Sequence, residues 1–292
     1  MTLLACLIFS TIAQEGSFAR TAEQLHLTPS AISHAVAGME AECGFPLFTR
    51  TKTGVTMTAA AESLRPAVRR VLASSESLDQ SIAQVNGLHK GVLRVGVFNS
   101  ACVVWLPRLV PEFEKDYPGI EVEVYQGSYA DIESWLKNGT AELGFLSDSC
   151  SQDLDFEPLY TDPLVCIAPP DFKPKRAGRI SADELRALPF VSQRADTDAD
   201  IQNYLKRNDL HVHTSCYVID DESMVGMVAC GQGVAIMPQL LLTRPSSETG
   251  VQVLTLEPAA ERRIGLACLD KNGLSPAAKE FARRVRNFAK TL

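Results

Sequence analysis

The chain has 292 residues, 46% of them hydrophobic and 22% charged, which is the balance of an ordinary globular protein with two or three compact units. Its formal net charge of -7 excludes a strongly basic protein that holds nucleic acid by charge alone. Residues 1–90 carry seven Lys/Arg and seven Asp/Glu, whereas the remainder carries 21 and 28. The N-terminal part is therefore electrically neutral, and its charge permits DNA binding without indicating it.

The eight cysteines include no CxxC pair, which excludes the spacing of a zinc ribbon and the framework of a small disulfide-rich secreted domain. We expect free thiols, no metal site, no cofactor and a cytoplasmic location. The apolar start, residues 1–13, lacks the positive charge that begins a signal peptide, so we interpret it as a buried first helix. No later segment approaches the roughly 18 apolar residues of a membrane span.

Two short helices joined by a tight turn are predicted next. Ser17 can cap a helix over residues 18–25, and Thr28 can cap a second helix in which Pro29 takes the first position. The second helix continues to about residue 42. Its inward positions are Ile32, Val36 and Met39, and its outward positions are Ser30, Ser33, His34 and Ala37. Such a pair, with a small and polar outer face, has helix-turn-helix geometry.

Residues 59–88 are predicted to form one long polar helix without glycine until its end. Apolar or small residues repeat at alternating steps of four and three, which is typical of a coiled-coil seam. The seam consists of Met57, Ala61, Leu64, Val68, Val71, Ser75, Leu78, Ile82 and Val85. We expect this helix to pair with a second copy, although packing on its own domain is the alternative.

From Gly91 onward, apolar strands alternate with amphipathic helices, which predicts a parallel α/β sheet. We expect strands at residues 91–98, 120–126, 142–146, 164–168, 190–192, 214–219, 231–238 and 263–270, and helices at 99–117, 129–138, 181–188, 199–208, 221–230 and 275–292. The first and last strands should return to one lobe, with the middle segment forming a second lobe.

Ligands of open α/β sheets bind beyond the carboxyl ends of the strands. The strand ends predict an effector site at Asn99, Ser100, Ala101, Cys102, Gly127, Ser128, Ser147, Ser192, Gln193 and Arg194. Ser100 and Ser128 precede helix N-termini, and Arg194 adds a positive charge, so we expect an anionic metabolite. The nearby Phe98, Phe145 and Tyr129 leave a neutral or aromatic ligand as the alternative.

The N-terminal sequence from Ala13 to Glu40, followed by GFPLFTR at 44–50 and GVTMT at 54–58, resembles the DNA-binding domain of LysR-type transcriptional regulators. The C-terminal landmarks Leu106-Pro107, Tyr117-Pro118, Gly127 and Met237-Pro238 resemble the effector-binding domain of the same family, which is similar to periplasmic solute-binding proteins. The resemblance implies a two-stranded wing around residues 52–54. It also implies DNA contacts at Arg20, Thr28, Pro29, Ser30, Ser33, His34, Arg50 and Lys52.

Four positions depart from the family pattern. His34 stands where the family often has Arg, and Thr53 stands at a wing position that often holds Arg. Leu4 and Leu7 replace residues that are usually polar. We therefore expect fewer permanent positive charges at the DNA. Electrostatic affinity for DNA should then depend mainly on Arg20, Arg50 and Lys52.

The predicted fold is an N-terminal all-α winged helix-turn-helix (1–58), a dimerising linker helix (59–88) and a two-lobed α/β effector-binding domain (89–292). Its first lobe comprises about 91–162 and 265–292, and its second about 163–264. We predict a transcription regulator, not an enzyme, with no catalytic residues. Its partners are double-stranded DNA, a small-molecule effector and a second copy, in a homodimer or homotetramer. The alternative is a thiol-based redox sensor that uses Cys102, Cys150, Cys216 or Cys230, with Cys102 activated near a helix N-terminus.

Overall fold

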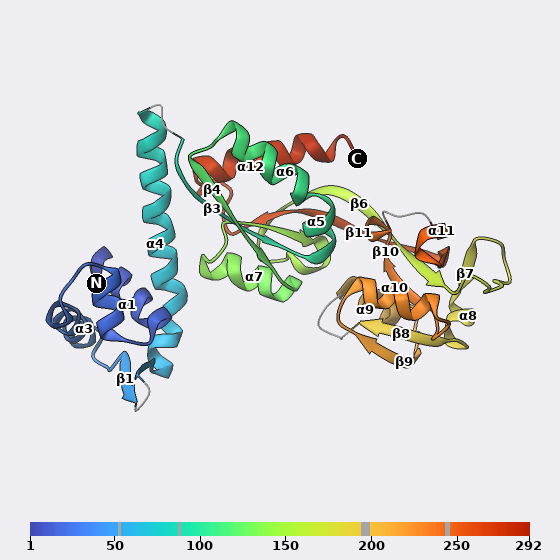
Figure 1. The fold of residues 1–292 in the computed structure, drawn as a ribbon, viewed down its shortest axis with the longest axis horizontal. Coiled ribbons are helices and arrows are strands. Elements are labelled where there is room, and N and C mark those ends of the chain that lie inside the picture. The colour runs from blue at the N-terminus through green and yellow to red at the C-terminus, as the bar shows by residue number, and fades with distance from the viewer. Residues whose placement is uncertain (52–53, 87–88, 194–198, 243–245) are drawn as a thin grey trace.

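The computed structural model describes residues 1–51, 54–86, 89–193, 199–242 and 246–292. Figure 1 shows three parts in a row: a helical unit at the N-terminus beside one long helix, a first α/β lobe, and a second α/β lobe at the far end. Among the described helices, none is long and apolar enough to cross a membrane.

The N-terminal unit packs three helices and a two-stranded wing around a small core. Thr2, Ser17 and Thr28 each cap a helix by accepting a hydrogen bond from a backbone N–H in its first turn. The buried side chains include Phe9, Ile12, Ile32, Met39 and Leu47. The elements are α1 (Leu3–Glu15), α2 (Phe18–Gln24), α3 (Pro29–Cys43), β1 (Phe48–Thr51) and β2 (Gly54–Met57), and the two strands pair antiparallel.

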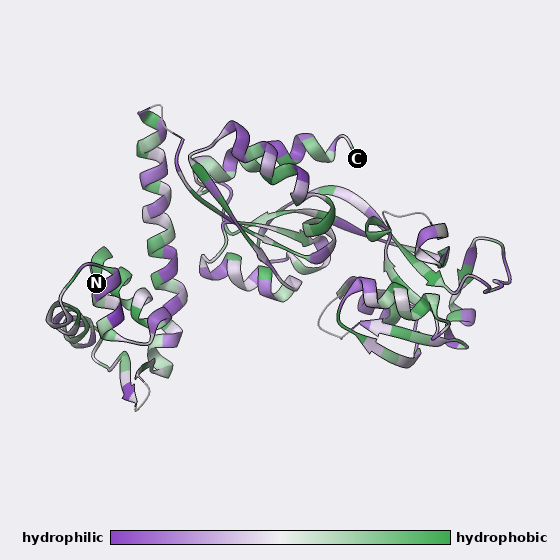
Figure 2. Cartoon of the chain, viewed as in Figure 1, coloured by the Kyte–Doolittle hydropathy of each residue, from purple (hydrophilic) through white to green (hydrophobic). Residues whose placement is uncertain are grey.

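The long helix α4 (Ala59–Val85) packs against both the N-terminal unit and the first α/β lobe. Its first half is part of the N-terminal core, where Ala61 and Val68 are buried. The packing alternative to the coiled-coil seam is therefore right for these positions. In the second half, four seam positions remain exposed in this single chain: Val71, Leu78, Ile82 and Val85, the last of which is 88% exposed. Figure 2 shows hydrophobic positions along α4 well beyond the part that packs on the N-terminal helices.

The first lobe is a sheet covered by helices, with Trp105, Phe113, Phe145 and Phe281 completely buried in its core. Strands β3, β4 and β5 pair parallel, as the sequence predicts. The lobe contains β3 (Gly91–Val97), α5 (Asn99–Val104), α6 (Leu106–Asp116), β4 (Ile120–Gln126), α7 (Tyr129–Asn138), β5 (Leu143–Ser147), η1 (Asp148–Cys150) and the C-terminal helix α12 (Pro276–Ala289).

The second lobe has separate apolar clusters around Leu185 and Phe190 on one side and around Met224 and Val228 on the other. Its strands β8 and β9 form a small parallel sheet. The lobe contains β7 (Arg179–Ser181), α8 (Ala182–Arg186), β8 (Pro189–Gln193), α9 (Ala199–Arg207), β9 (His213–Val218), α10 (Asp221–Ala229), β10 (Ala235–Pro238), η2 (Gln239–Leu241) and α11 (Ser246–Thr249).

Two long strands, β6 (Asp155–Ala168) and β11 (Gln252–Cys268), run through both lobes and pair antiparallel along most of their length. The prediction of a parallel sheet is therefore wrong in part, because the sheet is mixed. The sequence analysis missed the first half of each strand. Their polar and proline residues, such as Asp162, Pro163 and Pro258, interrupt the apolar pattern on which the prediction depended.

Candidate functional site

The first candidate site is the outer face of α3. Thr28 caps the helix, with its Oγ1 accepting from the Ala31 N–H at 3.1 Å, and Pro29 occupies the first turn. Ser30 and His34 are exposed and Ser33 is half-buried, while Ile32 on the opposite face is fully buried. Ser30, Ser33 and His34 therefore lie on the side of α3 that faces away from the core, and Figure 1 shows where α3 stands in the N-terminal unit.

Positive charge around α3 is sparse and partly engaged. The guanidinium of Arg20 pairs with Glu15 at 3.5 Å. The guanidinium of Arg50, on β1, lies over the ring of Phe18 at 5.7 Å, a contact that holds the side chain at the base of the wing. Lys52 lies outside the described residues. The predicted shortage of permanent cations thus applies to the part of this surface that the structure describes.

The second candidate site is a crevice of about 300 Å³ between the two α/β lobes. Five of the predicted effector residues line it: Asn99, Ser100, Gly127, Ser128 and Gln193. The sequence analysis also pointed to Phe98 and Tyr129, which line it too. The remaining lining residues were missed: Gln126, Ile219, Asp220, Asp221, Pro238, Leu241 and Arg262.

A buried ion pair lies at the base of this crevice, where Arg262 on β11 stands opposite Asp162 on β6. Their side chains are 3% and 0% exposed, and the shortest contact between them, from Nη2 to Oδ2, is 2.8 Å. The guanidinium also donates to Ser100 Oγ at 2.6 Å and to Tyr129 Oη at 3.0 Å. It further lies over the Phe98 ring at 5.1 Å. Arg262 thereby ties β11 to the segments that follow β3 and β4. Phe98 and Ser100 lie just beyond β3, and Tyr129 lies just beyond β4.

Asp221, the first residue of α10 in the second lobe, spans the crevice. One carboxylate oxygen accepts from Asn99 Nδ2 of the first lobe, and the other accepts from Gln193 Nε2 at 2.6 Å. Burial raises the pKa of Asp221, and the hydrogen bonds from Asn99 and Gln193 and the charge of Arg262 oppose this shift. The contact with Asn99 is a direct hydrogen bond between the lobes.

A second carboxylate, Asp200 on α9, also joins the lobes. Its Oδ1 accepts from Ser147 at 3.0 Å and from Ser149 at 2.7 Å, and its Oδ2 accepts from Tyr129 Oη at 3.1 Å. Because Tyr129 also accepts from Arg262, a chain of hydrogen bonds leads from β11 to the second lobe. Movement of one lobe against the other must therefore break or replace charge-assisted hydrogen bonds.

Other predicted effector residues lie outside the crevice lining. Ala101 is buried in the first-lobe core and Cys102 packs against it, because both follow the buried face of α5. Ser147 contacts Asp200 instead, and the Ser192 hydroxyl lies 3.0 Å from that of Thr214. Arg194 lies outside the described residues. Arg262 and Asp162 have no local signal in the sequence, because each lies in a polar stretch of its strand and the two meet only through the register of β6 and β11.

The thiols of the described residues are free, and the described residues contain no cluster suited to a metal ion. Burial raises the pKa of the Cys102 thiol, which is the opposite of the activated thiolate expected from its place near a helix N-terminus. The helix begins at Asn99, and the side chain of Cys102 turns toward the core.

Two family descriptions match the chain: "Bacterial regulatory helix-turn-helix protein, lysR family" over residues 4–62 and "LysR substrate binding domain" over residues 86–290. The chain belongs to the LysR family. It is a transcriptional regulator with an N-terminal helix-turn-helix domain and a C-terminal effector-binding domain.

Relatives of this LysR-type regulator match over nearly its whole length. It is 24% identical over 289 residues to the "Uncharacterized HTH-type transcriptional regulator YvbU" of Bacillus subtilis, covering 99% of both chains. Its fold is similar to that of a full-length OxyR variant from Pseudomonas aeruginosa, at a TM-score of 0.76 and 21% identity over 100% of this chain and 94% of the other. The QuiR effector-binding domain in complex with shikimate matches at a TM-score of 0.60 and 25% identity, over 69% and 98%.

Proposed function

We propose that this LysR-type regulator binds operator DNA as a dimer and that a small molecule in the interlobe crevice sets its activity. The observation that carries the proposal is the crevice itself, a concave space whose walls come from both lobes and meet through Asn99 and Asp221. A ligand that prefers one arrangement of the lobes shifts the protein toward that arrangement.

The proposed DNA surface is the outer face of α3 with the wing. Ser30, Ser33 and His34 would face base edges in the major groove, while Arg50, Arg20 and Lys52 would contact phosphates. A regulator that acts on bacterial DNA would work in the cytoplasm, and we propose this location. The proposed boundaries of the three units remain 1–58, 59–88 and 89–292.

The proposed dimer contact is the exposed seam on α4. Val71, Leu78, Ile82 and Val85 repeat at steps of seven, four and three, so they form one apolar stripe on one side of the helix. Pairing two copies along this stripe would bring two α3 helices to two half-sites of DNA. A tetramer would add a further contact between effector-binding domains.

The crevice favours a ligand with hydrogen-bond donors over the anion that the sequence analysis predicts. Two carboxylates, Asp220 and Asp221, line it, and the guanidinium of Arg262 is already paired with Asp162. Ser128 Oγ donates to Asp131 in a capping box, so its hydroxyl also serves the fold. We therefore propose a small polar metabolite with hydrogen-bond donors for this crevice.

Footprinting on the DNA upstream of this protein's own gene, with and without fractionated metabolite extracts, tests the proposal. We expect Arg50→Ala to weaken the footprint, so that more protein is needed to protect the same DNA. We expect Asn99→Ala to keep the footprint but to lose its response to the extract. Asn272→Ala, on an exposed loop of the first lobe outside the crevice, is the matched control and should respond like wild type. A response of Asn99→Ala equal to that of wild type would remove the crevice as the effector site.

A further inference from the structure

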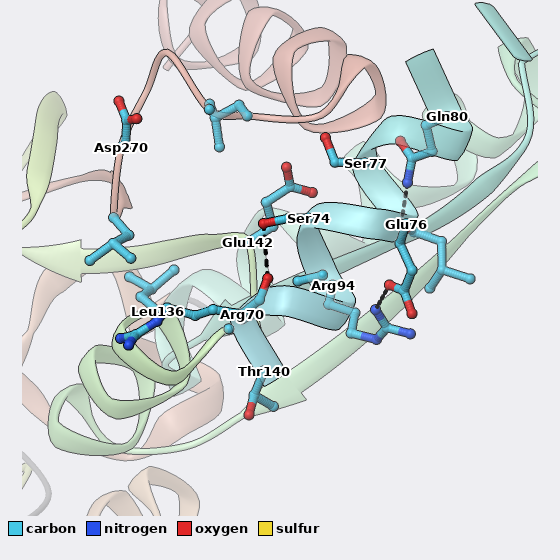
Figure 3. A pocket seen from close by; sticks show the side chains of 17 residues that line it. Arg70, Ser74, Glu76, Ser77, Gln80, Arg94, Leu136, Thr140, Glu142 and Asp270 are labelled. Carbon is cyan, nitrogen blue, oxygen red and sulfur yellow. Dashed lines mark hydrogen bonds and ion pairs between the residues drawn. The ribbon is translucent and has the colours of Figure 1, made fainter. Parts of the chain in front are cut away.

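A second cavity, of about 260 Å³, lies where α4 meets the first lobe, separate from the interlobe crevice. Helix α4 packs here against α7, α12 and β3. The size suits a small metabolite, since drug-sized ligands occupy pockets from about 300 Å³ upward. Figure 3 shows the side chains that α4 and the first lobe contribute to it.

The cavity exists because hydrogen bonds tie α4 to the lobe on either side of it and α4 carries small residues in between. At one end, the Arg70 guanidinium donates to the Lys137 carbonyl at 3.2 Å, and at the other Gln80 Nε2 donates to the Val92 carbonyl at 2.9 Å. The residues between and opposite are too small to fill the space: Ala73, Ser74, Ser77, Gly139 and Ala141.

Gln80, one of the residues that line the cavity, has a buried side-chain oxygen without a hydrogen-bond partner among the described residues. The Gln80 side chain is only 8% exposed, and its Oε1 accepts no hydrogen bond from the residues that the structure describes. A buried amide oxygen without a donor is unfavourable, because it has lost its hydrogen bonds to water and gained none from the protein. Its Nε2 is fixed on Val92, so the oxygen points away from that strand, and Figure 3 shows it on the side of Gln80 nearer to Ser77. A ligand with a hydrogen-bond donor would give this oxygen a partner.

The charges of the wall favour a cation. Arg94 is shared between Glu76 at 2.5 Å and Glu123 at 3.0 Å, so it neutralises no other carboxylate (Figure 3 shows the pair with Glu76). Glu142 accepts from the Ser275 backbone N–H and hydroxyl at the start of α12. Burial raises the pKa of Glu142, the hydrogen bonds from Ser275 oppose this shift, and the charge of Glu76 adds to it. A cation beside Glu142 would favour its ionised form. With Asp270, three carboxylates face two guanidinium groups across the wall.

We propose that this junction cavity binds a small organic cation with a primary ammonium group and a short aliphatic chain. The ammonium donates to Gln80 Oε1 and lies beside the Glu142 carboxylate. The chain packs against apolar side chains of the first lobe: Val92, Leu136 and Leu274. Such a ligand adds contacts between α4 and the first lobe, and it acts at a site different from the crevice.

Calorimetric titration of the full-length protein with n-butylammonium chloride tests the proposal. We expect saturable binding to wild type and at least tenfold weaker binding to Ser77→Leu, whose larger side chain occupies part of the cavity. Ser63→Leu makes the same change on an exposed position of α4 outside the cavity, and should bind like wild type. Asn99→Ala should also bind like wild type, which separates this site from the crevice.

Gln80→Met removes the unpartnered oxygen with little change in shape, and we expect it to weaken binding at least tenfold. Neutral n-butanol and anionic butyrate should bind at least tenfold more weakly than the ammonium. No saturable binding to wild type, or equal binding to wild type and Ser77→Leu, would overturn the site. Equal binding of n-butanol would overturn the cation as its ligand class.

Discussion

In α3, the exposed side chains of Ser30 and His34 lie within two turns of one helix, whereas the crevice takes Asn99, Asp221 and Arg262 from three elements far apart in the chain. The α3 side chains point to solvent. The crevice side chains bond to one another across the lobes. A DNA surface can thus be ready before its partner arrives, whereas a crevice ligand must replace hydrogen bonds that already exist.

Arg262→Met should give the largest effect, because it leaves Asp162 buried without its partner. We expect the free energy of unfolding to fall by about 3–5 kcal/mol. Urea denaturation measures this value. The neighbouring Arg263 is 59% exposed and pairs with Asp148, so Arg263→Met should cost less than about 1 kcal/mol.

The double variant Arg262→Met/Asp162→Leu sharpens this result. Because it removes both buried charges, it should be more stable than Arg262→Met alone. If the double variant is less stable, the pair is not the source of the loss, and the contacts of Arg262 with Ser100 and Tyr129 carry it instead.

Leu78→Asp places a charge in the exposed seam of α4 and should weaken the dimer by roughly 2–4 kcal/mol, because it would lie in the centre of an apolar contact. Sedimentation equilibrium measures the change. Gln84→Asp adds the same charge to the same helix away from the seam and should leave the dimer intact. Unchanged dimerisation of Leu78→Asp would show that the two copies pair through another surface. The exposed stripe on α4 would then not be a surface that, like the outer face of α3, awaits a partner.

Ser33→Ala and Arg50→Ala test two kinds of DNA contact: Ser33 is proposed to contact a base and Arg50 a phosphate. Arg50→Ala should weaken binding to all sequences and reduce the salt slope by about 1. Ser33→Ala should cost about 1 kcal/mol on the operator only, since a hydroxyl reads a base edge. Fluorescence anisotropy on operator and random DNA at several salt concentrations separates the two. Equal losses of Ser33→Ala on both DNAs would argue against base contact.

Asp221→Asn should give the smallest effect, visible as a change with pH. Burial raises the pKa of Asp221 above its ordinary value of 3.8, against the opposing effects of Asn99, Gln193 and Arg262. The native state therefore binds this proton more tightly than the unfolded chain does, and it gains stability as the pH falls through the raised pKa toward 3.8. Asn binds no proton. Wild type should thus gain stability relative to Asp221→Asn on acidification, and a difference that stays constant between about pH 7 and 4 would contradict it.

The helix-turn-helix could be predicted because its information is local. The caps Ser17 and Thr28 and the inward spacing of Ile32 and Met39 lie within a few turns of each other. Half of the crevice could be predicted for a similar reason, since residues such as Asn99 and Gly127 directly follow strands.

Arg262 and Asp221 could not be predicted, because their role depends on pairing between distant segments. Arg262 meets Asp162 only through the antiparallel register of β6 and β11. Asp221 meets Asn99 only when the second lobe folds back on the first. The division of α4 into a buried first half and an exposed second half was equally hidden, since the heptad spacing continues through both.

Helix α4 is continuous from the N-terminal core to the first lobe, so a rotation of the helix at the lobe would be carried to the N-terminal unit. Its 27 residues span about 40 Å at about 1.5 Å per residue. From Gln80, which is bonded to the first lobe, back to Ala59 the helix spans about 32 Å, so a tilt of about 6° at Gln80 displaces Ala59 by about 3.3 Å, close to the roughly 3.4 Å between successive base pairs. A change at the lobe too small to rearrange any core would therefore shift the N-terminal domain by a distance comparable to one base-pair step.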